Sequence, residues 1–445
     1  MRDTVDWTRL GDETIDLLRR YLMIDTTNPP GNETAGVEFL AKALAGDEIA
    51  CETAEAAPGR GNLVARLAGD GSLGGIVLHH HIDVVYADRR YWSVDPFAGE
   101  IRDGYLYGRG ALDMKSTGIL QLAALLAIKR AGVPLKRDLV LLATADEEAG
   151  SRFGAQFVAE RRRPWLAGAE YALSELSGVE VNPGYRMPLG VIVISEKTGL
   201  PITLTARSDP GHGSMPWPDT APHRLIRALG RLLAAERPLR VLPEIQEHFR
   251  LVGEVLPAGS GVGYDDVERS LRDPAFRERF LADRHRAATV RTTFAVTMLR
   301  GSEKINVIPP EATAAIDCRM LAGDDPEEIA TWVRQVVNDP NVEVEIDDEP
   351  KVPNLSPPDT ELYKALADSL RRRLPGTVVA PQVLVAFTDN WVFRGLGLHG
   401  YGWSPFVLDT GEYRRIHGND ERISLENLRE GVRAYVELLL AVAAA

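Results

Sequence analysis

Acidic and histidine side chains follow several short apolar runs of this chain, and this pattern limits what the chain can fold into. The stretches are His81-Ile82-Asp83, Asp113, Glu147-Glu148, Glu175 and His417. A carboxylate at the end of a buried strand is unfavourable unless a counter-charge pairs with it. The carboxyl edge of an α/β sheet is also where such folds place their sites. We therefore predict that these side chains converge on a pair of bound metal ions at one sheet edge.

Length and charge narrow the class of protein further. At 445 residues the chain exceeds the usual size of a single core, so two domains are expected. The net charge of −13 argues against nucleic acid or an anionic membrane as partner. The first residues lack the apolar core of a signal peptide, and no uncharged apolar run reaches about 18 residues. These two observations predict a cytoplasmic protein. Only two cysteines occur, Cys51 and Cys318, so we expect neither a disulfide framework nor a thiolate zinc site.

The segments around the first acidic stretches alternate between strand and helix patterns. Strands are predicted over 62–67, 76–84 and 139–144, and a helix over 116–131 that ends before Gly132 and Pro134. This alternation is typical of a mostly parallel sheet that helices cover on both faces.

The pattern of predicted secondary structure changes at about residue 198. Patterns of strand, helix, strand, strand, helix and strand follow in turn, which is the order of a ferredoxin-like α+β domain. Residues 237–290 form an additional polar, helical segment that we expect to border the cleft or a dimer contact. We predict an α/β catalytic domain from 1–197 and 351–445, with an inserted lid and dimerisation domain over 198–350.

The histidine-rich strand offers more than one candidate ligand. His81 and Asp83 are two residues apart, so their side chains leave the same face of the strand. Imidazole and carboxylate both suit zinc. Asp83 is either a direct ligand or a hydrogen-bond acceptor that fixes the His81 ring. His79 shares this face and His80 points away, and for both we favour a hydrogen-bonded structural histidine.

Each of the other candidates has an ordinary alternative role when it is taken alone. Asp113 precedes a helix, where aspartate commonly caps the N-terminus. Glu147 and Glu148 fit a solvated loop, or one binds a metal while the other transfers protons. Glu175 ends a short apolar strand and His417 lies in a loop, and neither is diagnostic by itself. The combination favours a metal site.

The motifs, in this order, resemble a known enzyme family. HHHIDVV, GRGALDMKS and TADEEAG are similar to its first three motifs, GHGSMPWPDTA and NVIPPEATAAIDCRM to its inserted domain, and TDN and IHGNDE to its closing motifs. This is the dinuclear-zinc metallopeptidase family of aminoacylases, glutamate carboxypeptidase, acetylornithine deacetylase and succinyl-diaminopimelate desuccinylase. YGWSP is similar to the branch that contains carboxypeptidase S. The resemblance extends over essentially the whole chain.

The resemblance implies a catalytic domain of zinc-exopeptidase type and a role for each motif residue. Glu147 would be the general base and later the acid, Asp83 would orient His81, and Asp113 would bridge two zinc ions, for which cobalt or manganese can substitute. The five implied metal ligands are His81, Asp113, Glu148, Glu175 and His417.

Two positions depart from the commonest form of the family. VAFTDN lacks the Gly-Gly that usually precedes Thr-Asp, which bears on the floor of the pocket. Leu176 follows Glu175 where glycine is frequent, which makes Glu175 the least typical of the ligands.

The inserted domain contributes three further candidates. The resemblance implies a homodimer, formed through this domain, in which His212 reaches the oxyanion in the partner's site. Arg319 and Asn306 are predicted to hold the substrate carboxylate, because a planar guanidinium binds a carboxylate through two parallel hydrogen bonds. The ordinary alternatives are an exposed loop histidine for His212 and a surface salt bridge for Arg319.

The predicted activity is hydrolysis of an amide bond next to a free carboxylate. A water bridging two zinc ions would attack the amide while Glu147 takes its proton. The substrate is a small molecule or peptide: a dipeptide, a peptide C-terminus or an N-acyl amino acid, which the motifs do not separate. Two alternatives stay open, a non-catalytic member that uses the cleft for binding alone and an aminopeptidase.

Overall fold

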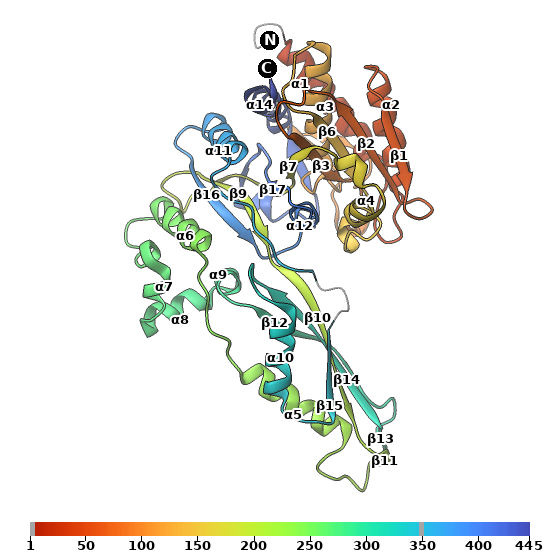
Figure 1. The fold of residues 1–445 in the computed structure, drawn as a ribbon, viewed down its shortest axis with the longest axis vertical. Coiled ribbons are helices and arrows are strands. Elements are labelled where there is room, and N and C mark those ends of the chain that lie inside the picture. The colour runs from red at the N-terminus through yellow and green to blue at the C-terminus, as the bar shows by residue number, and fades with distance from the viewer. Residues whose placement is uncertain (1–4, 347–350) are drawn as a thin grey trace.

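The computed structural model describes residues 5–346 and 351–445, whose strands form two main sheets. Figure 1 shows a larger α/β body that holds both chain termini and a smaller sheet that extends away from it. The larger sheet has ten strands. In spatial order they are β1 (Cys51–Glu55), β2 (Gly61–Leu67), β6 (Leu139–Thr144), β3 (Gly75–His81), β7 (Ala169–Ser174), β17 (His399–Gly402), β9 (Leu189–Glu196), β8 (Ser177–Val181) and β18 (Val407–Asp409), with β16 (Val378–Leu384) also paired to β9.

Side chains of the central strands alternate between two apolar cores. In β3, Ile76 and Leu78 pack under α1 (Trp7–Leu22), α3 (Lys115–Arg130) and α14 (Leu425–Ala443), and Val77 packs under α4 (Ala155–Arg161) and α12 (Asn390–Gly395). Strands buried on both faces need nearly continuous apolar sequence, such as LVLLAT of β6. β6, β3, β7 and β17 are parallel to one another. The predicted mostly parallel sheet, covered on both faces, is confirmed.

Shorter elements complete the larger body. The last strand of a three-stranded sheet directly precedes the closing helix α14. Its strands are β19 (Arg422–Ser424), β5 (Tyr105–Tyr107) and β4 (Glu100–Arg102), and the further helices are α2 (Glu33–Ala45), α11 (Glu361–Arg373) and α13 (Thr410–Tyr413).

The smaller sheet is antiparallel and has two helices on one face. Along the chain its elements are β10 (Thr198–Arg207), α5 (Ala221–Ala234), β12 (Thr293–Arg300), β14 (Glu311–Met320), α10 (Pro326–Val337) and β15 (Val342–Ile346). The predicted β-α-β-β-α-β order of an inserted α+β unit is confirmed. In space the strands lie in the order β12-β14-β10-β15, so β12 and β15 are the edges.

The chain leaves and re-enters the large sheet at one place. Lys197 alone separates β9 from β10. On its return, Leu355 forms an antiparallel bridge with Ser195, and the N–H of Ser356 donates to the carbonyl of Ile194 at 2.9 Å. The domain limit at 197/198 stays a prediction, as does the limit at 350/351, where residue 350 lies outside the described residues.

The additional segment, residues 237–290, is helical, as predicted. It contacts the junction between the two sheets. Its helices are α6 (Pro243–Val255), α7 (Val267–Ser270), α8 (Pro274–Ala282) and α9 (Arg284–Thr289). The His248 ring of α6 lies 2.9 Å from the carbonyl of Pro381 in β16. At the other end of the segment, Nζ of Lys197 donates to the carbonyls of Ala288 at 3.0 Å and Arg291 at 2.7 Å.

Candidate active site

Three neighbouring parallel strands bring predicted ligands to one edge of the large sheet. β3 ends at His81, β6 leads into the single turn Glu147–Ala149, and β7 is followed by Glu175. Because β3 pairs in parallel with both β6 and β7, the three carboxyl ends lie side by side. Asp113 precedes α3 and His417 lies in the loop before β19, and both reach the same cluster.

The side chains meet in two groups that share Asp113. In the first, Nε2 of His81 lies 3.0 Å from Oδ1 of Asp113 and 3.5 Å from Oε2 of Glu175. In the second, Nε2 of His417 lies 3.2 Å from Oδ2 of Asp113 and 3.3 Å from Oε1 of Glu148. Within each group the ligand atoms lie within 4.8 Å of one another. One carboxylate oxygen of Asp113 therefore faces each group.

Glu147 lies beside the two groups but belongs to neither. Its carboxylate forms a further candidate group with His81 and Glu148. Glu148 also lies 3.3 Å from His417, whereas no candidate group contains both Glu147 and His417. The adjacent glutamates thus differ in their surroundings.

Asp83 is fully buried and binds the backbone beside the cluster. Its carboxylate accepts from the side-chain amide of Asn28 at 2.8 Å and from the N–H groups of Glu147 and Glu148 at 3.1 Å each. The backbone carbonyl of Asp83 lies 2.9 Å from Nδ1 of His81, which leaves Nε2 of that ring facing the cluster. Of its two possible roles, this geometry favours support of His81 and of the glutamate loop.

A buried network that sequence reasoning missed continues from Asn28. Its amide also donates to Asp146 at 3.1 Å, Asp146 accepts from Arg60 at 2.8 Å, and Arg60 binds Glu33 at 2.7 Å. Asp146 has a φ of 71°, a left-handed conformation that is uncommon outside glycine. Because Asp146 directly precedes Glu147, the network supports the turn that directs the glutamate. These partners lie in separate segments with no shared periodicity, so no sequence signal joined them.

The burial of several carboxyl groups together makes the cluster suitable for cations. Asp113, Glu147 and Glu175 are each less than a tenth exposed. Burial, and next the charge of Glu175, raises the pKa of Glu147 well above its usual value. Burial, and next Asp113, raises the pKa of Glu175 to about 8. Although burial opposes it, hydrogen bonds from His417 and His81 hold the pKa of Asp113 below its usual value. A cation would offset the cost of these buried charges, and the donors suit zinc.

The other two histidines of β3 follow the alternation of the strand. The ring nitrogens of His79 lie 2.8 Å from the hydroxyls of Ser174 and Thr144, as expected of a structural histidine. His80 points to the opposite face, against α3, where a Cβ on Gly118 would lie 2.4 Å from its ring. Among the described residues, neither joins a candidate metal group.

His212 and Asn306 lie together, away from the cluster of their own chain. His212 is in β11 (Gly211–His212), which pairs with β13 (Val307–Ile308) directly after Asn306. Figure 1 shows this ribbon at the end of the small sheet that is farthest from the large one. No sequence pattern predicted these two-residue strands.

Arg319 lies at the other end of the small sheet. It pairs with Gly199, two residues beyond Lys197, and its Nε donates to Asp317 at 2.9 Å. From Arg319 to Glu311 at the far end of β14 the distance is about 26 Å, at about 3.3 Å per residue. Arg319 and Asn306 of one chain are therefore too far apart to hold the same carboxylate.

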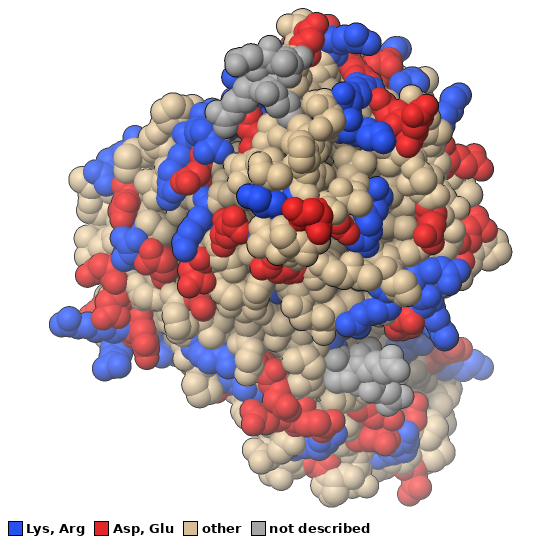
Figure 2. Space-filling view, turned by 45° about the horizontal axis from the view of Figure 1, so that its top comes forward, with Lys and Arg blue, Asp and Glu red and all other residues tan. Residues whose placement is uncertain are grey.

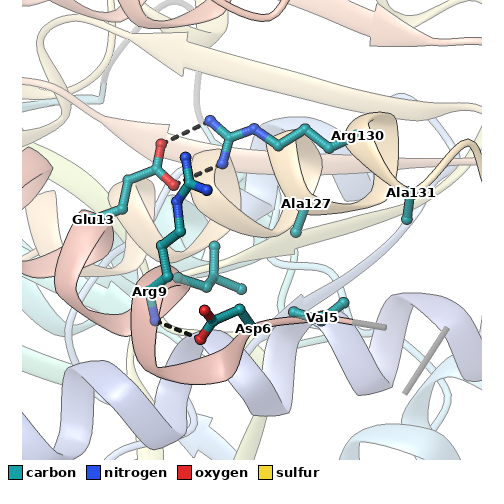
Figure 3. A pocket seen from close by; sticks show the side chains of 8 residues that line it. Val5, Asp6, Arg9, Glu13, Ala127, Arg130 and Ala131 are labelled. Atoms are coloured by element: carbon teal, nitrogen blue, oxygen red, sulfur yellow. Dashed lines mark hydrogen bonds and ion pairs between the residues drawn. The ribbon is translucent and has the colours of Figure 1, made fainter. Parts of the chain in front are cut away.

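Outside this cluster, the described residues form no further candidate metal group. A hollow of about 510 Å³ lies between the start of α1 and the end of α3. Figure 3 shows that Arg130 pairs there with Glu13, at 2.6 Å. Figure 2 shows acidic and basic side chains interspersed over one face, without a continuous basic field among the described residues there. None of the helices in the described part of the chain is long and apolar enough to cross a membrane.

Comparisons with known proteins agree with the resemblance and with this geometry. The chain is 33% identical over 373 residues to the N-fatty-acyl-amino acid synthase/hydrolase PM20D1 of Xenopus tropicalis, covering 81% of this chain and 70% of that protein. It is 29% identical over 387 residues to a probable carboxypeptidase S-like 2 of Dictyostelium discoideum, covering 83% and 72%. The fold is similar to that of the M20 family metallo-carboxypeptidase Sso-CP2 from Sulfolobus solfataricus, with a TM-score of 0.70, 18% identity and coverage of 96% and 98%.

The family match spans most of the chain. The model of peptidase family M20/M25/M40 covers residues 77–441, from β3 into α14, and so includes every residue of the cluster. The predicted resemblance is confirmed, and with it a metal-dependent hydrolase acting on amide bonds of peptides or N-acyl amino acids. This chain belongs to peptidase family M20/M25/M40.

Proposed function

We propose that this enzyme hydrolyses the amide bond of N-acyl amino acids with two zinc ions in the cluster. The observation that carries the proposal is Asp113, which turns one carboxylate oxygen to each of two donor groups. When bound, the ions supply Lewis acidity that polarises the amide carbonyl and lowers the pKa of water. Their ligands would be His81, Asp113, Glu148, Glu175 and His417.

Glu147 is assigned as the proton shuttle. It lies beside both groups without belonging to either, so its carboxylate is available to a water molecule. It takes the proton of the water that attacks the amide carbonyl and then delivers it to the leaving nitrogen. Asp83 binds the N–H groups of both glutamates and so fixes the position from which Glu147 acts.

A second copy of the chain is proposed to complete the site. His212 and Asn306 lie at the far tip of the small sheet, whereas Arg319 lies near the junction with the large one. Edge strand β12 and the outer face of α5, where Ile226 and Leu233 are each 65% exposed, are available for isologous pairing. In such a homodimer His212 would donate to the oxyanion in the partner subunit's site.

Recognition of the substrate carboxylate is assigned to both chains of that dimer. Arg319 would bind it from the chain that holds the zinc ions, and Asn306 would reach it from the partner subunit. This division follows from the length of β14, which keeps the two residues of one chain apart.

We assign N-acyl amino acids as the substrate class because of the names of two similar proteins. One is named for N-fatty-acyl-amino acids and matches at 33% identity, and the other is named as a carboxypeptidase and matches at 29%. Both descriptions fit a carboxylate close to the amide that is cleaved. An aminopeptidase would instead need an acidic group to hold a free amino terminus.

A substrate panel tests the proposal. It contains N-acyl amino acids of short and long chain, dipeptides with the same C-terminal residue, and aminoacyl amides with a free amino terminus. We expect the N-acyl amino acids to be cleaved fastest, with loss of activity in a chelator and recovery on adding zinc. Faster cleavage of dipeptides or aminoacyl amides would overturn the substrate class. Binding without turnover by the zinc-loaded protein would favour the non-catalytic alternative.

A further inference from the structure

A buried ion pair outside the cluster links two of its members. Nη1 of Arg109 lies 2.6 Å from Oε2 of Glu421, and the side chains are 3% and 0% exposed. Arg109 lies in the turn before α3 and Glu421 directly precedes β19, so the pair joins segments 312 residues apart. The first of these segments contains Asp113 and the second follows His417.

Glu421 binds the backbone of the Asp113 segment. Its Oε1 accepts from the N–H of Leu112 at 2.7 Å and of Asp113 at 3.1 Å, and its Oε2 accepts from the N–H of Gly110 at 3.2 Å. These hydrogen bonds hold the peptide units that direct the Asp113 carboxylate between the two donor groups.

Arg109 binds the backbone of the His417 loop. Its Nη2 donates to the carbonyl of Gly418 at 2.9 Å and to those of His417 and Tyr86 at 3.4 Å each. His417 has a φ of 58°, in the left-handed region that favours glycine, so its loop needs support from outside. A planar guanidinium can bind several carbonyls at once, whereas an ammonium is a point charge at the end of a flexible chain.

We infer that Arg109 and Glu421 are positioning residues that fix Asp113 relative to His417 and so set the affinity of their donor group for its metal ion. The inference rests on the proposed metal site. Groups that orient metal ligands typically contribute roughly 10–100-fold to metal affinity. The other donor group depends on the pair only through Asp113, so its affinity should change less.

The ordinary alternative is that the pair only stabilises the fold, and the chain offers a matched control for it. Arg394 and Glu196 form another buried ion pair, 2% and 0% exposed. Arg394 also donates to a backbone carbonyl, that of Gly400, at 2.8 Å. Arg394 and Glu196 make no described hydrogen bond to any of the five proposed ligands.

The test compares Arg109→Lys with Arg394→Lys in the 445-residue chain. The metal-free proteins are titrated with zinc against a chromophoric chelator. We expect wild type and Arg394→Lys to bind two ions alike, and Arg109→Lys to bind one of its two ions roughly 10–100-fold more weakly. Unchanged affinity in Arg109→Lys, or equal weakening in both variants, would overturn the inference. Failure of the wild type to bind two ions would instead overturn the metal site itself.

A second pair of variants covers the case in which Arg109→Lys does not fold. Glu421→Gln keeps the shape of the side chain but has one acceptor oxygen, whereas the donors around Glu421 in the wild type bind both of its oxygens. Glu196→Gln is its control. Thermal unfolding of the metal-free proteins identifies variants that fold, and undiminished zinc affinity in folded Glu421→Gln would again overturn the inference.

Discussion

Replacing Glu147 with glutamine should greatly slow catalysis while leaving both metal groups complete. Glutamine has a similar shape but takes no proton, and loss of a general base lowers turnover by roughly 10²–10⁴-fold. At about 1.36 kcal/mol per factor of ten, this raises the barrier by about 2.7–5.4 kcal/mol. Because Glu147 belongs to neither of the two groups that share Asp113, the zinc content should stay at two ions.

Glu148→Gln is the matched variant, since the adjacent glutamate has the opposite assignment. Glu148 lies 3.3 Å from His417 and belongs to one of the groups that share Asp113, so its replacement should lower the zinc content. Amino acid release from an N-acyl substrate gives the turnover, and elemental analysis after dialysis at fixed free zinc gives the metal content. If Glu147→Gln lost zinc and Glu148→Gln retained it, the two roles would be reversed.

Three further predictions concern the dimer, the substrate and the core. Inactive His212→Ala and inactive Glu147→Gln chains should regain activity when mixed, because a mixed dimer has one intact site. No recovery after demonstrated subunit exchange would exclude action of His212 in the partner's site. Arg319→Lys should lower kcat/KM for substrate acids far more than for the corresponding amides, and an equal loss on both would indicate a structural role. Gly118→Ala should lower the free energy of unfolding in denaturant by roughly 1–3 kcal/mol, because its Cβ would lie 2.4 Å from the ring of His80; an unchanged midpoint would mean that the ring moves aside.

Elements whose signals lie within one segment were predictable from the sequence. The strand over 139–144 agrees with β6, because an apolar run ends at polar residues on both sides. The second helix predicted in the inserted domain agrees with α10, where Asp325 caps the N-terminus and a proline begins the helix. The alternation of His79, His80 and His81 also followed from strand geometry alone.

Features that depend on distant partners were not predictable in this way. Taken alone, Asp113 had the appearance of a helix cap, yet α3 begins after Met114 and the Asp113 carboxylate lies between two histidines. The network from Asn28 to Arg60 joins loops that no pattern relates. The separation of Asn306 from Arg319 depends on where β13 and β14 run in space.

The contact between Ser195 and Leu355, where the chain leaves the large sheet and returns to it, bears on how such an enzyme can diversify. Because the two ends of the inserted segment lie next to each other, the large sheet is continuous without it. Insertion of a domain at such a point is well tolerated. One continuous segment of the chain therefore contains the small sheet, its helices, helices α6 to α9, His212, Asn306 and Arg319. Substitutions within that segment would change the proposed substrate and dimer contacts, while the proposed metal ligands on either side of it stay the same.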